Sequence, residues 1–355
     1  MPQPASAVDV ISPAIARARR LMFPYRWSRW WRLGLLALAT GEMNSCGSGF
    51  SVPNLPSGGG SSGGRAPFPT FPIEAWIPFF IILGIGILVL VLVHTYVASV
   101  LRFALFDTVA LERFHLRESW SRRHTQGLRF FGFNLLYVLV FWSVLALFGL
   151  MLWVMFRQSF ASHAWGAGTV LLGVVLIFVV LFLAMLAGLG YVVIKDFTIP
   201  MVAIEDLSMT NALARLWRMV GARPGAYAGY LGMKILLSLA AGVLLGIVNF
   251  FLILIVVVPV VIVAIAIGVT APHILQSPAL IALAVTVGLF LVCLLLLAMA
   301  IVSSPVVAFF QSYALEFFAG RYQPLWLLLH PETPPAAPDP TMAPLPEPPP
   351  LPSPA

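Results

Sequence analysis

Long apolar stretches alternate with short semi-polar connections along most of this chain. A helix needs about 20 apolar residues to cross the roughly 30 Å hydrocarbon core of a bilayer. Four stretches reach that length between charged residues, and each is expected to form one span: residues 77–101, 131–156, 168–194 and 278–302. The pattern therefore predicts an all-α, polytopic transmembrane helical bundle.

A fifth apolar stretch, residues 226–269, is too long for a single span. As one helix rising 1.5 Å per residue it would reach about 66 Å, twice the thickness of the hydrocarbon core. We expect it to turn back near Gly246–Asn249, giving spans at 226–247 and 248–269 and about six in all. If residues 248–269 re-enter the membrane instead of crossing it, five spans remain.

The segments outside the apolar stretches differ from one another in composition. Residues 1–43 combine arginines with aromatic side chains and are expected to form an interfacial amphipathic segment. Residues 44–73 are rich in Gly, Ser and Pro and are interpreted as a linker, while residues 331–355 are interpreted as a Pro-rich disordered tail. The transmembrane domain itself is assigned to residues 74–325.

The connection that follows the span at 168–194 predicts a second amphipathic helix. Asp206 or Ser208 can cap its first turn by accepting a backbone hydrogen bond. Its apolar positions recur at helical spacing and fall on one face: Met209, Leu213, Leu216 and Val220. We therefore expect this helix to lie at the membrane surface.

Composition places the chain in a membrane. Hydrophobic residues make up 60% of its 355 residues and charged residues 9%, against roughly 45–50% and about 25% in soluble domains. So few charges cannot cover a soluble fold of this size, which excludes soluble enzymes and nucleic-acid-binding modules. The net charge of +7 comes almost entirely from arginines beside apolar stretches, where basic residues set topology and contact anionic lipids. Membrane lipids are the expected partners, and no nucleic acid is expected.

The sequence contains no recognisable motif for catalysis or for binding a metal or cofactor. It has no His-Glu-x-x-His zinc motif, no Gly-x-Ser-x-Gly nucleophile turn and no Walker lysine. We therefore predict that the protein is not an enzyme and uses no cofactor and no metal.

The densest group of charges lies where the span at 168–194 meets the amphipathic helix. Its members, with one lysine from inside the next apolar stretch, are Asp196, Glu205, Asp206, Arg215, Arg218 and Lys234. Two interpretations stay open: the charges fasten the surface helix to the span as caps and ion pairs, or they bind a lipid headgroup or cation. Because an unpaired carboxylate at a partly dehydrated boundary is costly, Asp196 is expected to pair with one of these cations.

A distinctive motif covers the same region: Lys195-Asp-Phe-Thr-Ile-Pro-Met-Val-Ala-Ile-Glu-Asp-Leu-Ser208, followed by Ala212-Leu-Ala-Arg-Leu-Trp-Arg218. This motif resembles the signature of a bacterial multi-pass family labelled as the membrane domain of glycerophosphodiester phosphodiesterases, together with related proteins of unknown function. The resemblance extends more loosely over residues 8–325. It implies a membrane domain alone, because the phosphodiesterase activity lies in a separate (β/α)₈ barrel of about 250 residues, for which this chain has no room.

These features together predict a protein of the bacterial inner membrane with a non-enzymatic role in membrane organisation or lipid handling. A transporter of small solutes or lipids is the alternative, since Lys234, Asn249 and Pro259 weakly resemble the polar, interrupted spans of transporters. With six spans, basic residues divide almost evenly between the two sides. We expect cytoplasmic termini, because a segment with seven arginines before the first span is difficult to export.

Overall fold

The structure is a computed structural model, and it describes residues 6–23, 25–42, 73–112, 116–162, 166–270 and 278–331. Within these ranges the chain forms nine helices and no strand, which confirms the all-α prediction. The expected linker at 44–73 and tail at 331–355 lie outside the described residues, apart from residues 73 and 331 at their edges.

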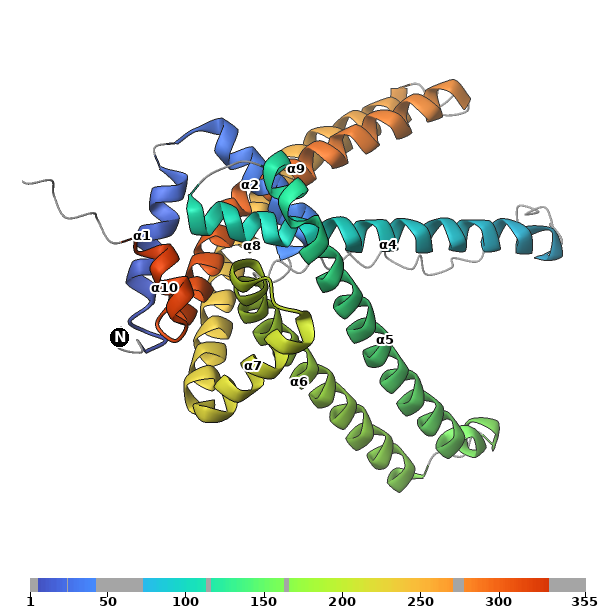
Figure 1. Cartoon of the computed structure of the whole chain (residues 1–355). Helices are drawn as coiled ribbons and strands as arrows, with labels where there is room; N and C mark the ends of the chain where they lie inside the picture. Colours follow the sequence, from blue (N-terminus) through green and yellow to red (C-terminus); the bar gives the residue numbers. More distant parts are fainter. Residues whose placement is uncertain are drawn as a thin grey trace, which may run out of the picture.

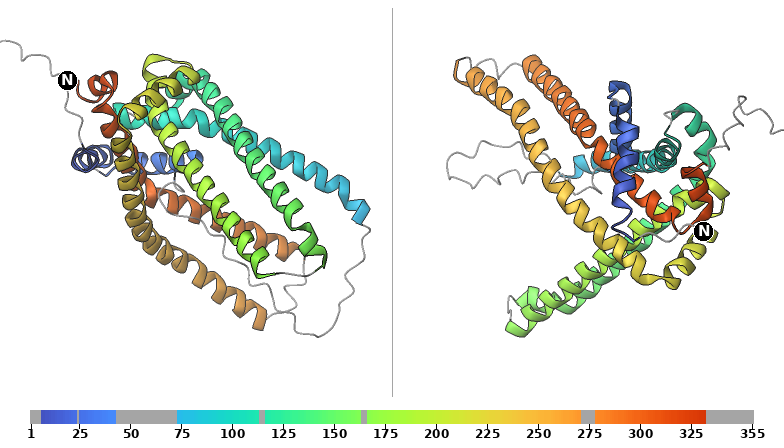
Figure 2. Two further views of the ribbon diagram at one scale, coloured as in Figure 1. Left: turned by 90° about the horizontal axis from the view of Figure 1, so that it is seen from below. Right: turned by 90° about the vertical axis from the view of Figure 1, so that its left-hand side faces the viewer.

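Five long helices leave a common base on the same side and project from it as apolar arms (Figures 1 and 2). They are α4 (Ile73–Leu111), α5 (Leu116–Ser162), α6 (Ala167–Glu205), α8 (Pro224–Thr270) and α9 (Pro278–Ala319). α5 and α6 form one arm, α8 and α9 a second, and α4 a third. All five helices are long and apolar enough to cross a membrane, and their most apolar stretches are not buried within the protein.

The base contains the inner ends of the long helices and four short ones, α1 (Ile11–Met22), α2 (Trp27–Thr40), α7 (Met209–Ala222) and α10 (Gln323–Leu329). α1 and α2 both pack on α9. Gly34 of α2 lies so close to α9 that an added Cβ would be 3.0 Å from the backbone of Ala300. At Gly127 of α5 an added Cβ would be 2.8 Å from the Cα of Val100 on α4. These two glycines let the helices of the base cross in close contact.

Aromatic side chains from α6, α8 and α9 fill the centre of the base. The ring of Phe197 lies 5.1 Å, centroid to centroid, from the rings of both Tyr230 and Phe318. Tyr230 also stacks on Tyr313 at 5.3 Å. All four side chains are fully buried, and such ring pairs contribute about 0.5–1.5 kcal/mol each beyond their buried area. The base is thus a packed core, whereas the arms need lipid or other protein to cover them.

The apolar stretch at 226–269 does not turn back near Gly246–Asn249, and that expectation was wrong. α8 continues through this point as one helix of 47 residues. One face of its first turns, including Tyr230 and Lys234, is buried in the base, so the part beyond these turns is left to cross a bilayer. The described residues therefore contain five candidate spans; this is the smaller of the two expected numbers, although no re-entrant segment is involved.

The amphipathic helix expected after the third span is confirmed as α7. Ser208 is its N-cap, with the Oγ accepting a hydrogen bond from the backbone N–H of Asn211. Asp206 is not the cap; it follows the last residue of α6 in the left-handed conformation, with φ of +49°. Met209, Ala212 and Leu216 on the inner face of α7 are buried.

The N-terminal helices and α10 belong to the same base. Arg17 of α1 donates a hydrogen bond to the backbone carbonyl of Leu329 at the end of α10. One face of α2 is buried, while Trp27 at its start is 58% exposed and Tyr25, which precedes the helix, is 56% exposed. α4, in contrast, begins at the outer end of an arm (Figure 1). In the sequence, residues 43–72 separate the end of α2 in the base from the start of α4. These residues lie outside the described part of the chain.

Cysteine labelling tests whether the base and the outer ends of the arms lie on opposite sides of a membrane. In a background without Cys46 and Cys293, single cysteines replace Arg157 at the outer end of the α5–α6 arm or Arg218 in the base. Because a charged maleimide does not cross the bilayer, intact cells should be labelled at one position only, and permeabilised cells at both. Labelling of both positions in intact cells would contradict the arrangement.

Candidate functional site

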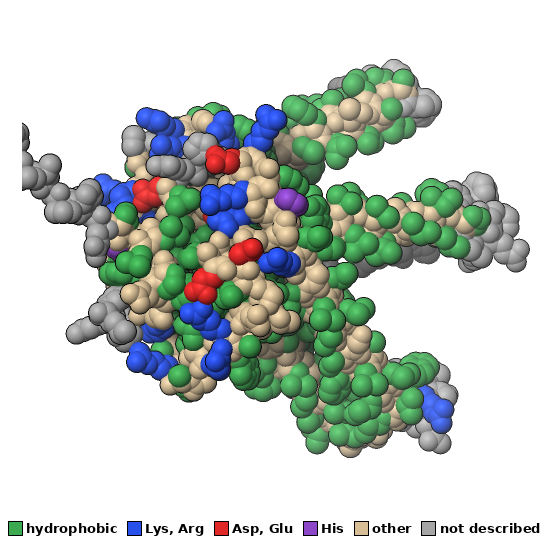
Figure 3. Space-filling model, viewed as in Figure 1, with side chains coloured by type: hydrophobic (Ala, Val, Ile, Leu, Met, Phe, Trp, Pro, Cys, Tyr) green, Lys and Arg blue, Asp and Glu red, His purple; other side chains and the backbone are tan. Residues whose placement is uncertain are grey.

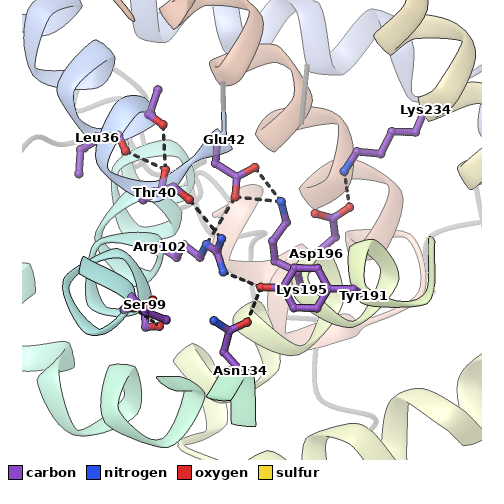
Figure 4. A network of polar contacts seen from close by, with 12 residues as sticks. Leu36, Thr40, Glu42, Ser99, Arg102, Asn134, Tyr191, Lys195, Asp196 and Lys234 are labelled. Atoms are coloured by element: carbon purple, nitrogen blue, oxygen red, sulfur yellow. Dashed lines mark hydrogen bonds and ion pairs between the residues drawn. The ribbon is translucent and has the colours of Figure 1, made fainter. Parts of the chain in front are cut away.

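Ionisable side chains meet in the base where the inner ends of the long helices approach the end of α2. Lys195 on α6 donates to both carboxylate oxygens of Glu42, at 2.9 and 2.7 Å. Arg102 on α4 faces the same carboxylate, with its Nε 3.7 Å from Oε1 (Figure 4). One acid and two cations therefore connect the end of α2 to α4 and α6.

Arg102 extends these contacts to α5. Its guanidinium donates to the hydroxyl of Tyr191 at 2.8 Å and to the backbone carbonyl of Thr40 at 3.1 Å. The Tyr191 hydroxyl in turn donates to Oδ1 of Asn134 at 2.8 Å. Arg102 is thus held directly by groups on α2 and α6 and, through Tyr191, by α5, as Figure 4 shows.

Asp196, the next residue after Lys195, forms a second pair with α8. Lys234 and the hydroxyl of Tyr230 both donate to Oδ2 of Asp196, the hydroxyl at 2.7 Å. The side chains of Asp196 and Lys234 are only 3% and 11% exposed. This confirms the expectation that Asp196 is paired. We name Glu42, Arg102, Lys195, Asp196 and Lys234 the buried charge network.

Very little empty space surrounds this network. The cavity bounded by Glu42, Arg102, Lys195 and Asp196 has a volume of about 10 Å³, close to the minimum that a single water molecule needs. The charges therefore face one another within packed protein and do not line a water-filled path.

Glu205, another predicted site residue, pairs with α7 and α10. Its carboxylate accepts hydrogen bonds from Arg215 at 2.7 Å and from the hydroxyl of Tyr322 at 2.6 Å. Arg215 is partly exposed, so this pair adds little to stability by itself. Its effect is to hold the end of α6 against the neighbouring helices.

Asp206 and Arg218, the remaining predicted residues, lie apart from both groups. Asp206 accepts hydrogen bonds from Gln126 and Arg129 of α5, each at 3.1 Å. Arg218 is exposed on α7, and the described part of the chain contains no ion pair to it. The predicted residues therefore form separate contacts: Asp196 pairs with Lys234, Glu205 with Arg215, and Asp206 with Arg129. Arg218 takes part in none of these ion pairs.

Two more buried ion pairs join other helices of the base. Arg17 of α1 donates to Glu316 of α9 at 2.8 Å. Arg123 of α5 forms a two-pronged contact with Asp107 of α4, at 3.0 and 2.9 Å. The base thus contains charges in its interior as well as on its surface.

Sequence reasoning missed Glu42 as a member of the network. Its composition could have identified it, since Glu42 is the one acidic residue between Asp9 and Glu74, in a segment rich in arginine. Its partner Lys195 is 153 positions away in the sequence, so spacing alone could not identify the pair. The hydroxyls of Tyr191 and Tyr230 carried no sequence signal for their roles.

The pKa of Glu42 reflects its surroundings. Burial raises the pKa of this carboxyl, but the positive charges of Lys195 and Arg102 outweigh that effect. The pKa consequently lies below its ordinary value of 4.5, and Glu42 is ionised near neutral pH.

The model of a family of unknown function, DUF7544, matches residues 5–328 of this chain. The chain belongs to this family. Comparisons with curated proteins and with solved structures give no match. The DUF7544 match covers all the arms and the base up to the last turn of α10, and the buried charge network lies within it.

Neutralising Asp196 should destabilise this DUF7544 protein. In Asp196→Asn the charge of Lys234 stays buried without its counter-charge, and removing one partner of a buried pair typically costs about 3–5 kcal/mol. Arg218→Ala is the control, because surface changes of this kind usually alter stability by less than about 0.5 kcal/mol. Thermal unfolding in detergent should give a clearly lower Tm for Asp196→Asn. Equal Tm values for the two variants would rule out a structural role for the pair.

Acidification should weaken the link between α2 and α6. Because the folded-state pKa of Glu42 is depressed, its contribution to stability is complete above about pH 4.5 and is lost as the pH falls through that lower pKa. Thermal unfolding as a function of pH should therefore show a steeper loss in the wild type than in Glu42→Gln, which does not titrate. Parallel pH profiles for the two proteins would contradict this role of Glu42.

Proposed function

We propose that this DUF7544 protein organises the membrane or handles lipids without catalysing a reaction. The observation that carries the proposal is the division between a packed, charge-containing base and arms whose apolar stretches the protein leaves uncovered. In a bilayer, such stretches are covered by acyl chains or by another membrane protein. The resemblance to membrane domains of glycerophosphodiester phosphodiesterases also supports a lipid-related role.

The arrangement differs from the one expected of a transporter. Transporters place polar groups near the bilayer midplane, at breaks in spanning helices. In this protein Asp196 and Lys234 pair inside the base, and α8 continues unbroken through Pro259. The long helices diverge as arms and do not surround a common path (Figure 2).

An apolar groove on the α5–α6 arm offers a specific contact for lipid. It has a volume of about 180 Å³ and is lined by both helices. The hydroxyl of Tyr137 in its wall donates to the backbone carbonyl of Ala187 at 2.7 Å, so this hydroxyl is already satisfied. Because the arm would be surrounded by bilayer, the occupant that we propose is an acyl chain of a phospholipid.

We further propose that the base faces the cytoplasm of a bacterial inner membrane. Among the Lys and Arg residues that the structure describes, only Arg157 follows the apolar stretch of its helix toward the outer end of an arm. On the face drawn in Figure 3 the basic side chains gather over the base. Positively charged residues concentrate on the cytoplasmic side of membrane proteins. A six-span topology divides the basic residues almost evenly between the two sides of the membrane. With all the arms on one side of the base, the described basic residues lie mostly on the side of the base.

Filling the groove tests the lipid proposal. Ala184→Phe places a ring in the groove, while Ala146→Phe adds the same ring at an exposed position of the same arm as a control. Native mass spectrometry after purification in mild detergent should show bound phospholipid on the wild type and on Ala146→Phe, and less on Ala184→Phe at an unchanged Tm. Equal lipid retention by both variants would count against the groove.

A flux measurement separates the proposal from its alternative. Proteoliposomes containing the wild type should show no solute or lipid flux above that of empty vesicles. Flux that disappears in a folded Lys234→Met variant would overturn the proposal in favour of a transporter.

A further inference from the structure

A larger cavity lies on the side of the base away from the arms. It is bounded by α7, the start of α8, the end of α9 and the start of α10, which lie together at that side (Figures 1 and 2). Its volume is about 740 Å³. Its described lining shares no residue with the buried charge network or with the α5–α6 groove, so neither of those sites accounts for it.

The lining of this cavity is strongly basic. Arg215, Arg223 and Arg321 contribute to its wall, and the described lining contains no Asp or Glu. Glu205 compensates Arg215 from outside the lining. Arg223 is exposed, without an ion pair in the part of the chain that the structure describes. Arg223 therefore brings to the cavity wall a positive charge that no acidic residue of the described lining balances.

Two of the three guanidinium groups lie over aromatic rings. The guanidinium carbon of Arg321 is 3.8 Å from the ring centroid of Phe317, and its NH1 donates to the backbone carbonyl of that residue at 2.9 Å. Arg215 lies over the ring of Tyr322 at 5.1 Å. A guanidinium held in this way loses less conformational freedom when it binds an anion. These arginines are positioned in advance, unlike freely solvated surface side chains.

Tyr227 adds an uncharged donor to the wall. This residue is 3% exposed, and its hydroxyl has no hydrogen-bond partner among the described residues. Leaving a buried polar group unpaired is unfavourable, because it loses its hydrogen bonds to water without replacing them. An acceptor oxygen that reached this buried hydroxyl from the cavity would remove the penalty.

The charges at the wall also act on one another. Burial lowers the pKa of Arg321; Tyr227 opposes this effect and the positive charge of Arg223 adds to it. All three groups line the same cavity, and like charges on one wall repel each other. An anion placed between them would relieve the repulsion.

We propose that this cavity binds a phosphate-bearing anion, with Arg223 and Arg321 as its cationic contacts and Tyr227 as a hydroxyl donor. The planar guanidinium group matches pairs of phosphate oxygens and forms charge-assisted hydrogen bonds with them. The position of the cavity away from the arms favours a water-soluble phosphate compound over a lipid in the bilayer. A phospholipid headgroup offers the same chemical group, so the test includes both sources.

Calorimetric titration of the full-length protein in detergent with inorganic phosphate and with pyrophosphate tests the site. Saturable binding is expected, and Arg223→Gln or Arg321→Gln should weaken it about tenfold or more, because a hydrogen bond to a charged group contributes roughly 1.5–3 kcal/mol. Arg218→Gln changes an exposed arginine of α7 outside the cavity lining and should bind like the wild type. Binding that is absent, or equal in all these variants, would overturn the proposal.

Tyr227→Phe provides a second measurement that a merely structural role would not reproduce. Removing an unpaired hydroxyl should leave the Tm of the ligand-free protein unchanged or raise it, while phosphate binding becomes weaker. A lower Tm without ligand, together with unchanged phosphate binding, would show that the hydroxyl serves the fold and would remove it from the site.

Short-chain phosphatidic acid below its micellar concentration distinguishes the source of the phosphate. If it displaces inorganic phosphate and binds more tightly through Arg223 and Arg321, the natural ligand is a lipid headgroup. If pyrophosphate binds more tightly than the lipid, the ligand is water-soluble. Either result supports a phosphate site, and both are independent of lipid retention in the α5–α6 groove.

Discussion

Two lysines neutralise two carboxylates at the point where α2, α6 and α8 meet, and Arg102 brings α4 to the same place. A buried ion that loses its partner is penalised by several kcal/mol. None of these helices can therefore leave the base without stranding a charge in its interior. The arms cannot supply such a constraint, because the apolar face of a spanning helix packs almost as well against lipid as against another helix. The position of each arm thus depends on its inner end.

This dependence explains why the N-terminal helices belong to the base. Glu42 directly follows α2 and is the counter-charge of Lys195. A base without α2 would leave Lys195 and Arg102 facing each other with no acid between them. Gly34 complements the ion pair by letting α2 approach the backbone of α9 closely. The segment at 1–43, which its composition suggests is an interfacial attachment, is in its described part a structural component of the base.

The sequence predicted the features that depend on local pattern. Apolar length identified four of the five candidate spanning helices, α4, α5, α6 and α9, and helical spacing after Ser208 identified α7. The penalty for a buried carboxylate predicted that Asp196 is paired, and Lys234 is its partner. Hydropathy failed at residues 226–269 because an aromatic protein core and a lipid core are equally apolar. Tyr230 therefore looked like part of a span, although it lies in the centre of the base.

The same aromatic core lies between the basic cavity and the buried charge network. Tyr227 lines the cavity, and its ring centroid is 5.5 Å from that of Phe197. Phe197 in turn contacts Tyr230, which donates a hydrogen bond to Asp196. Three rings, those of Tyr227, Phe197 and Tyr230, would therefore separate an occupant of the cavity from the charges that hold α6 and α8 together. Close-packed rings of this kind have little room to move independently, so binding at the cavity would stabilise the base as a unit, by mass action, and would leave each arm anchored where the network holds it.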